Sequence, residues 1–317
     1  MDKSEENPTH IAPPPDTNQT TRMKELELMH HWCSKTCHSF SPAMSTIFQD
    51  YAVYLGTRHE LLMDSLLALT CLHSVTERTG PDCHSSIKID DAFPYQERAL
   101  PIFRTELERI SQSNCEVLLL CSMVMMAFAA VSPIFISEGD TIPGGDLKGS
   151  KSSLTSMFFF GKGIHSVIDG ARPWLEKSPL KVAIRLYPRE YWTSPMPDTG
   201  SLPPELNDMC DNVSESLRGI YSRAIVMLEN CTAVDERMTL AWAIEVGDAF
   251  VTQVEEQESV ALLIYIYWGA VIGSSKDMWW ARLAGQIIVR RLSPLVSVEV
   301  EGKHTIIDWA KQRIGHG

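Results

Sequence analysis

One uncharged stretch limits the possible folds of this chain more than any other feature. Residues 117–136 are twenty positions without a formal charge, which is long enough to cross a bilayer. The flanking charges are Glu116 on one side and Glu138 and Asp140 on the other, so neither end has the basic anchor typical of a membrane span. Pro133 also ends a helix near the end of the run. We therefore expect a core helix and no membrane span.

Apolar residues recur at three- and four-residue spacing along most of the chain, which is the period of an amphipathic helix. Alternating strand patterns are almost absent. The pattern predicts an all-α fold, a single large helical domain of roughly eight to ten packed helices. Its expected helical segments are residues 24–40, 60–75, 95–110, 117–136, 154–175, 205–230, 233–255, 260–272 and 277–292, with a short one ending near Trp309.

Composition sets the expected domain boundaries. Residues 1–23 are polar and rich in Pro, Asn and Thr, so we expect a disordered leader. Residues 24–317 then form one domain. Within it, the Gly, Ser and Lys content of residues 137–153 predicts a long mobile loop, and the prolines of residues 187–204 predict an ordered surface crossing.

Charge and cysteine content narrow the function. The net charge is −12, from 40 acidic and 28 basic side chains, and the strongest basic cluster is Arg290-Arg291. Binding to nucleic acid needs clustered Lys and Arg, so direct DNA binding is not expected. Eight cysteines follow a polar N-terminus without a secretory signal, which favours reduced thiols in a soluble intracellular protein.

Five segments together carry a resemblance to a known family. Residues 25–32, ELELMHHW, look like the start of the regulatory domain of fungal zinc-cluster transcription factors. The similar segments that follow in the family's order are residues 59–75, 95–130, 161–180 and 261–280. The resemblance covers about residues 24–310 and is strongest to the branch that contains sterol uptake control proteins. It implies a helical ligand-sensing domain with a hydrophobic interior pocket, acting in transcription regulation or secondary metabolism, in the nucleus, the cytoplasm or both.

The family's DNA-binding half has no counterpart here. Complete regulators carry six cysteines that bind two zinc ions and place a helix in the major groove. Upstream of Lys24 there is no cysteine, and no C-x2-C spacing occurs anywhere. The resemblance therefore implies a regulator-like protein that forms a homodimer or relies on a DNA-binding partner protein. A gene model that lacks an upstream exon would leave the same sequence.

Flexible and flat apolar side chains suggest where a ligand would bind. Met123, Met126 and Phe128 share one predicted helix, and Tyr265 and Trp268 share another. Such side chains could line a cavity for a small hydrophobic ligand, sterol- or terpenoid-like as the resemblance implies. Plain core packing is the alternative for each of these residues.

Recognised catalytic motifs are absent: no G-x-S-x-G elbow, phosphate-binding loop or H-E-x-x-H occurs. We predict no catalytic residue and no cofactor. An alternative function remains, a regulator domain repurposed as a cyclase or isomerase for a hydrophobic secondary metabolite. It would gain rate by orienting substrate, with help from His73, Tyr265 or Asp64. Otherwise His73 is expected to be a core histidine bonded to the backbone.

One set of residues resembles a metal site. His30, Cys33 and Cys37 would share a face of the first helix, with His38 beside them, and thiolate and imidazole suit zinc. The same face carries Trp32 and other apolar residues that should pack into the core. We therefore predict no metal.

Overall fold

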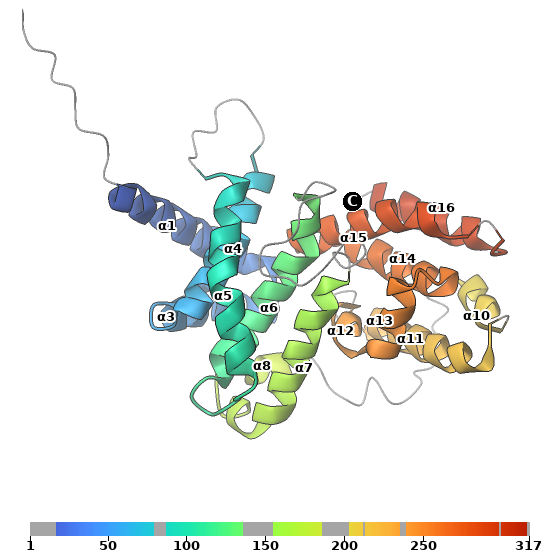
Figure 1. Cartoon of the computed structure of the whole chain (residues 1–317), viewed down its shortest axis with the longest axis horizontal. Helices are drawn as coiled ribbons and strands as arrows, with labels where there is room; N and C mark the ends of the chain where they lie inside the picture. The colour runs from blue at the N-terminus through green and yellow to red at the C-terminus, as the bar shows by residue number, and fades with distance from the viewer. Residues whose placement is uncertain are drawn as a thin grey trace, which may run out of the picture.

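The computed structural model describes residues 17–78, 87–135, 155–185, 203–211, 213–234, 239–297 and 299–315. Every regular element among these residues is helical, and no strand occurs in them. The helices pack into one body around a continuous apolar core, as Figure 1 shows. The protein is a single all-α domain, as its hydrophobic periodicity predicts.

The N-terminal half is built on four long helices. They are α1 (Thr17–Ser34), α4 (Glu60–Thr76), α5 (Ala92–Leu107) and α6 (Cys115–Val131). Helix α4 packs against the other three. Between α1 and α4 the chain forms short turns of helix, η1 (Thr36–Ser39), α2 (Pro42–Thr46), η2 (Ile47–Tyr51) and α3 (Ala52–Gly56).

The C-terminal half surrounds helix α14 (Ser259–Gly273). It contains α10 (Pro204–Asp211), α11 (Glu215–Val234), α12 (Thr239–Glu245), α13 (Asp248–Glu255), α15 (Trp279–Leu292) and α16 (Lys303–Gly315). Helix α7 (Ser156–Leu175), followed by the short α8 (Lys181–Arg185), lies between the halves and packs on both α6 and α12. Helix α15 also contacts α6, so the two halves share one core.

Helix α6 contains most of the uncharged segment of residues 117–136. All of its residues except Glu116 are buried, because α4, α7 and α15 cover it. In the described part of the chain it is the one helix long and apolar enough to cross a membrane, and 94% of its most apolar window is buried within the fold. This is the environment expected of a core helix.

The closest helix crossing depends on glycine. Helices α14 and α15 meet where Gly285 lies against Gly269 and Gly273, and a Cβ atom on Gly285 would fall on backbone atoms of both. Backbone atoms cannot move aside as a side-chain end can, so any larger residue would separate the helices. This contact positions α15, and with it Trp279 at its N-terminus.

Several expected boundaries were wrong. Helix α1 begins at Thr17, so residues 17–23 are helical where a disordered leader was expected; residues 1–16 lie outside the described residues. The segment 205–230 is split into α10 and α11. The segment 233–255 is split into α12 and α13 at Gly247, whose φ of 87° ends a helix that other residues would continue. Loop 137–153 and most of crossing 187–204 also lie outside the described residues.

Candidate functional site

The predicted ligand-binding residues of α6 lie in the core. Met123, Met126 and Phe128 are all buried. The ring of Phe128 meets Phe93 of α5 edge-on, with 6.3 Å between ring centroids. Phe128 therefore faces α5 in the N-terminal half.

The predicted residues of α14 belong to a different group of rings, here called the aromatic cluster: Phe158, Trp242, Tyr265 and Trp268. Tyr265 and Trp268 stack at 5.5 Å, and Phe158 lies 5.3 Å from Tyr265. Trp268 donates a hydrogen bond from Nε1 to the Thr239 carbonyl at 2.6 Å. Tyr265 and Trp268 thus lie beside α7 and α12, whereas Phe128 lies beside α5.

A groove of about 590 Å³ lies on the outside of the N-terminal half, where α1, α4 and α5 meet. Its apolar wall is formed by Leu26, Met29, Met63 and Leu67. Charged side chains surround it: Arg22, Glu25, Glu60, Asp64 and Arg98. Arg98 donates two hydrogen bonds to Asp64, at 2.6 and 3.0 Å, so this part of the rim is fixed by an ion pair.

The ELELMHHW segment is divided among three environments by the turn of α1. Leu28 and Trp32, one helical turn apart, point into the core. Leu26 is 55% exposed and reaches the groove with Met29. His31 points in a third direction, towards α4.

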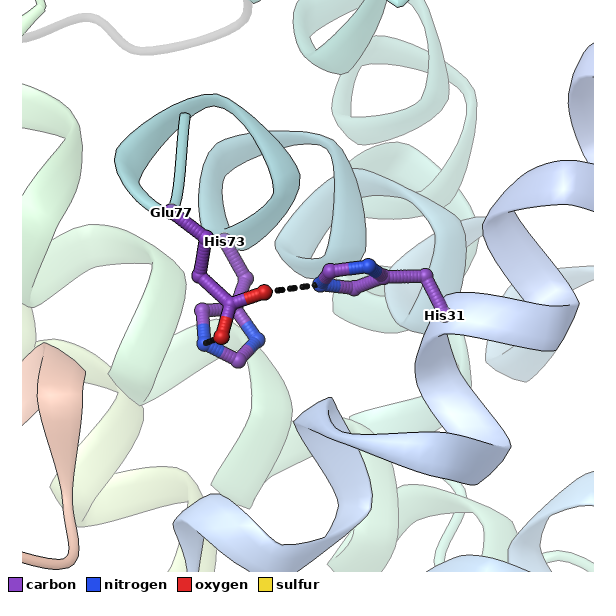
Figure 2. Close-up of side chains that lie close together, drawn as sticks. All are labelled: His31, His73 and Glu77. Carbon is purple, nitrogen blue, oxygen red and sulfur yellow. Dashed lines mark ion pairs between the residues drawn. The ribbon is translucent and has the colours of Figure 1, made fainter. Parts of the chain in front are cut away.

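His31 forms a polar group with two residues from the end of α4, here called the histidine cluster: His31, His73 and Glu77 (Figure 2). The two imidazole rings meet edge-on, with 5.1 Å between their centroids, and the Glu77 carboxylate lies beside both. Its Oε2 atom is 3.4 Å from His31 Nε2, and its Oε1 atom is 3.8 Å from His73 Nε2. One potential ligand atom from each residue lies within 4.8 Å of the others. His73 is buried, while Glu77 ends the helix and is partly exposed.

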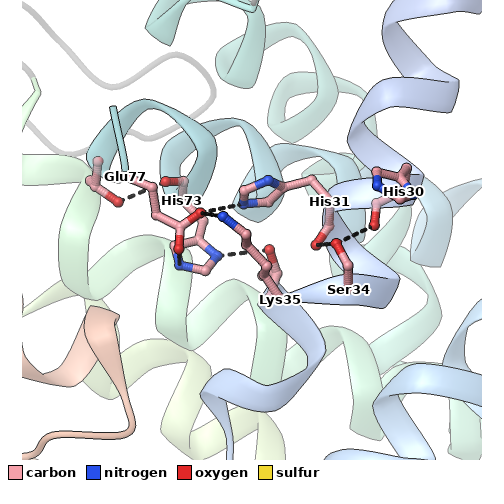
Figure 3. A network of polar contacts seen from close by, with 8 residues as sticks. His30, His31, Ser34, Lys35, His73 and Glu77 are labelled. Atoms are coloured by element: carbon pink, nitrogen blue, oxygen red, sulfur yellow. Dashed lines mark hydrogen bonds and ion pairs between the residues drawn. The ribbon is translucent and has the colours of Figure 1, made fainter. Parts of the chain in front are cut away.

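Neighbouring side chains contact the histidine cluster from three sides. Figure 3 shows its polar contacts, among them the one from Lys35 to Glu77. Thr36 Oγ1 lies 2.8 Å from His73 Nδ1, within hydrogen-bond distance. The Trp279 ring stacks on the His73 ring at 4.5 Å and is almost parallel to it. Lys35 donates a hydrogen bond from Nζ to Glu77 Oε2 at 2.8 Å. Thr36 in η1, Trp279 in α15 and Lys35, which lies between α1 and η1, thereby hold the two imidazoles and the carboxylate.

The environment sets the protonation of the histidine cluster. Burial lowers the pKa of His73 to about 4, although the charge of Glu77 opposes this. Burial also lowers the pKa of His31. Burial alone would raise the pKa of Glu77, but the hydrogen bond from Lys35 and the charges of His73, Lys35 and His31 bring it below its usual value. Near neutral pH the cluster therefore holds two neutral imidazoles and one carboxylate.

The histidine cluster was not predicted, although the spacing of two of its residues is visible in the sequence. His73 and Glu77 are four residues apart, so they share one face of α4. His73 was expected to bond to backbone; its partner is instead the Thr36 side chain. Nothing in the sequence pairs His31 with α4, because that contact depends on how α1 crosses α4.

The thiol and imidazole side chains near the end of α1 do not form a ligand set in the part of the chain that the structure describes. Cys37 Sγ donates to the Cys33 carbonyl, and His38 pairs with Ser45. Burial raises the pKa of Cys33, and that of Cys37 to about 11, so both stay protonated thiols. All seven described cysteines are free; Cys83 lies outside the described residues.

The three polar residues named for an enzyme have separate neighbours. Asp64 pairs with Arg98 at the groove. His73 lies nine residues further along α4, about 13 Å along the helix axis. Tyr265 Oη lies 3.6 Å from Met157 Sδ within the aromatic cluster. They do not form one reaction centre.

No protein-family model matches this sequence, and no curated protein matches it either. The resemblance to fungal regulators therefore rests on the five segments described above.

Proposed function

We propose that this chain is a regulator-like protein that binds a small hydrophobic ligand, of sterol or terpenoid type, and reaches DNA only through a partner chain. The five segments similar to fungal regulators support this proposal. The all-α fold agrees with it. The net charge of −12 also favours a chain that leaves phosphate contacts to another protein.

The groove between α1, α4 and α5 is the observation that carries the proposal. Its volume of about 590 Å³ lies within the roughly 300–1,000 Å³ of typical ligand sites. A sterol is a flat apolar body with a hydroxyl at one end. Met29, Met63 and Leu67 offer apolar contacts to such a body, and the carboxylates of Glu25 and Glu60 offer acceptors for a hydroxyl.

A fluorescence titration with the intrinsically fluorescent sterol dehydroergosterol tests the proposal. Met63→Glu places a charge in the apolar wall, and burying that charge against the ligand is costly. We expect affinity to fall at least tenfold. Met23→Glu is the matched control, because Met23 lies on the exposed side of α1 outside the groove lining. The control should bind as the unsubstituted protein does.

Two outcomes would overturn the proposal. If the unsubstituted protein does not bind sterol or terpenoid probes, the proposed ligand class is wrong. If the purified chain binds DNA tightly and sequence-specifically in a mobility-shift assay, the proposal that it reaches DNA only through a partner chain is wrong.

The same titration distinguishes the groove from the interior residues predicted earlier. Met126→Trp fills any space beside α6 and leaves the groove unchanged. If this variant loses sterol binding while Met63→Glu keeps it, the ligand occupies the interior and the groove assignment is wrong.

A further inference from the structure

We propose that His31, His73 and Glu77 form a binding site for a divalent transition-metal ion of the zinc type. The site is independent of the groove and of the function proposed above. Two imidazoles and one carboxylate are a ligand set that zinc and other first-row ions accept. Such a set leaves at least one coordination position for water or another ligand.

The geometry needs only a small movement to close around an ion. Ligand atoms at about 2.0–2.2 Å from a tetrahedral ion lie about 3.4 Å from one another. His31 Nε2 and Glu77 Oε2 are already 3.4 Å apart, and all three ligand atoms lie within 4.8 Å. Glu77 caps the C-terminus of α4, where helix ends fray, and its partly exposed side chain has room to turn towards an ion.

The Nε2 atoms of both imidazoles lack good hydrogen bonds, and a bound cation would give each of them a partner. His31 Nε2 is buried and has no hydrogen bond of good geometry among the described residues. The 3.8 Å between His73 Nε2 and Glu77 Oε1 is too long for a hydrogen bond. Both nitrogens therefore face the carboxylate without bonding it well.

The contact with Thr36 has the form found in metal sites. A metal-bound histidine uses one ring nitrogen for the ion and gives the other a hydrogen-bond partner, which fixes the tautomer. Thr36 is buried and lies 2.8 Å from His73 Nδ1. When Nδ1–H donates to Thr36, Nε2 presents its lone pair towards His31 and Glu77.

His165 shows what a histidine with satisfied partners looks like in the same molecule. Its Nδ1 lies 2.9 Å from Glu245 and its Nε2 lies 3.1 Å from Asp169. Both nitrogens are paired, and the side chain is partly exposed. His31 and His73 differ because their rings are more buried and their Nε2 atoms lack such close partners.

Lys35 competes with an ion for Glu77. Its Nζ donates to Oε2, but its side chain is 54% exposed, and exposed ion pairs contribute little to stability. The ammonium can therefore swing into solvent when a cation arrives, or remain on Oε2 while Oε1 binds the ion. Lys35→Gln removes this competition and should strengthen metal binding.

Calorimetric titration of the tag-free, chelator-treated chain with Zn²⁺, together with the absorption spectrum after Co²⁺ addition, tests the proposal. We expect one ion per chain. His31→Ala and Glu77→Gln each remove a ligand and should weaken binding by at least the roughly 10–100-fold that loss of a ligand's hydrogen-bond partner costs. Thr36→Val removes that partner and should cost about tenfold. His30→Ala is the matched control, since His30 is the exposed neighbour on the same helix.

Some results would overturn the site. If Zn²⁺ does not bind, or if His31→Ala and Glu77→Gln bind Zn²⁺ as tightly as His30→Ala does, these residues are not ligands. Circular dichroism of each variant separates loss of a ligand from loss of fold. A folded Glu77→Gln variant that retains the Co²⁺ spectrum also rejects the proposal. Sterol binding should be unchanged in His31→Ala, so failure of either proposal is recognised separately.

Discussion

The aromatic cluster is buried throughout, whereas the histidine cluster extends from the buried His73 to the partly exposed Glu77. The two clusters also differ in how their polar atoms are hydrogen-bonded. In the aromatic cluster, the indole nitrogens of Trp242 and Trp268 each donate to a backbone carbonyl, at 2.8 and 2.6 Å. In the histidine cluster, His31 Nε2 and the neighbouring Trp279 Nε1 make no hydrogen bond among the described residues. A buried polar atom without a hydrogen-bond partner lowers the stability of the fold. Packing alone therefore does not explain why such atoms occur in the histidine cluster.

The difference separates a region that serves stability from one that is available for binding. Rings of the aromatic cluster fill space and complete their own hydrogen bonds. The histidine cluster instead places three potential ligand atoms around one point, between helices α1 and α4. Substitutions in the two regions should therefore behave differently, both in size and in their dependence on pH.

The largest effect is expected in the aromatic cluster. Trp268→Ala removes a fully buried indole and leaves the Thr239 carbonyl without its donor. The free energy of unfolding should fall by about 3–5 kcal/mol. Denaturant titration measures this, with Trp174→Ala as the control because Trp174 is 37% exposed. A cost below about 1 kcal/mol for Trp268→Ala would show that the cluster is not a stabilising core.

An intermediate effect is expected from pH on the metal-free protein. The pKa of His73 is lowered to about 4 in the fold, against about 6.5 in the unfolded chain. Between these values the unfolded state binds the extra proton, so stability is present above about pH 6.5 and is lost on acidification. From pH 7.5 to pH 5 the loss should be about 2 kcal/mol. The lowered pKa of Glu77 acts in the same direction.

Denaturant titrations in chelator at both pH values check this dependence. His73→Gln cannot take up the proton and should lose about that much of the pH dependence. Parallel behaviour of this variant and the unsubstituted protein would show that His73 is not held neutral by the fold.

The smallest effect on stability is expected at His31. His31→Ala removes a partly buried ring whose Nε2 atom makes no good hydrogen bond. Without metal the free energy of unfolding should change by about 1 kcal/mol or less, close to the value for His30→Ala. If the free energy of unfolding falls by more than about 3 kcal/mol, His31 stabilises the fold as Trp268 does, and the proposed difference between the two clusters is wrong.

The fold was predictable where one physical argument dominated. An uncharged run such as residues 117–136 must be buried, and α6 is. Boundaries set by single residues were harder. The apolar periodicity of residues 233–255 predicts one helix, but Gly247 divides it. This boundary was missed because a positive φ is not visible in an apolar pattern. The start of α1 at Thr17 was missed because its first turns carry few apolar residues.

The candidate site was less predictable than the fold because its parts lie far apart in sequence. The spacing of His73 and Glu77 could have suggested a shared face of one helix. The contributions of His31, Thr36 and Trp279 depend on how α1, η1 and α15 pack around the end of α4. Hydrophobic periodicity fixes which face of a helix is buried but not which residues meet across an interface.

Diffraction from crystals grown with Zn²⁺, with anomalous data at the zinc absorption edge, tests the central claim most directly. We predict a peak at about 2.0–2.2 Å from His31 Nε2, His73 Nε2 and a Glu77 oxygen, with His73 Nδ1 still bonded to Thr36. A structure in which Lys35 remains on Glu77 and no zinc lies between the two imidazoles would contradict the claim.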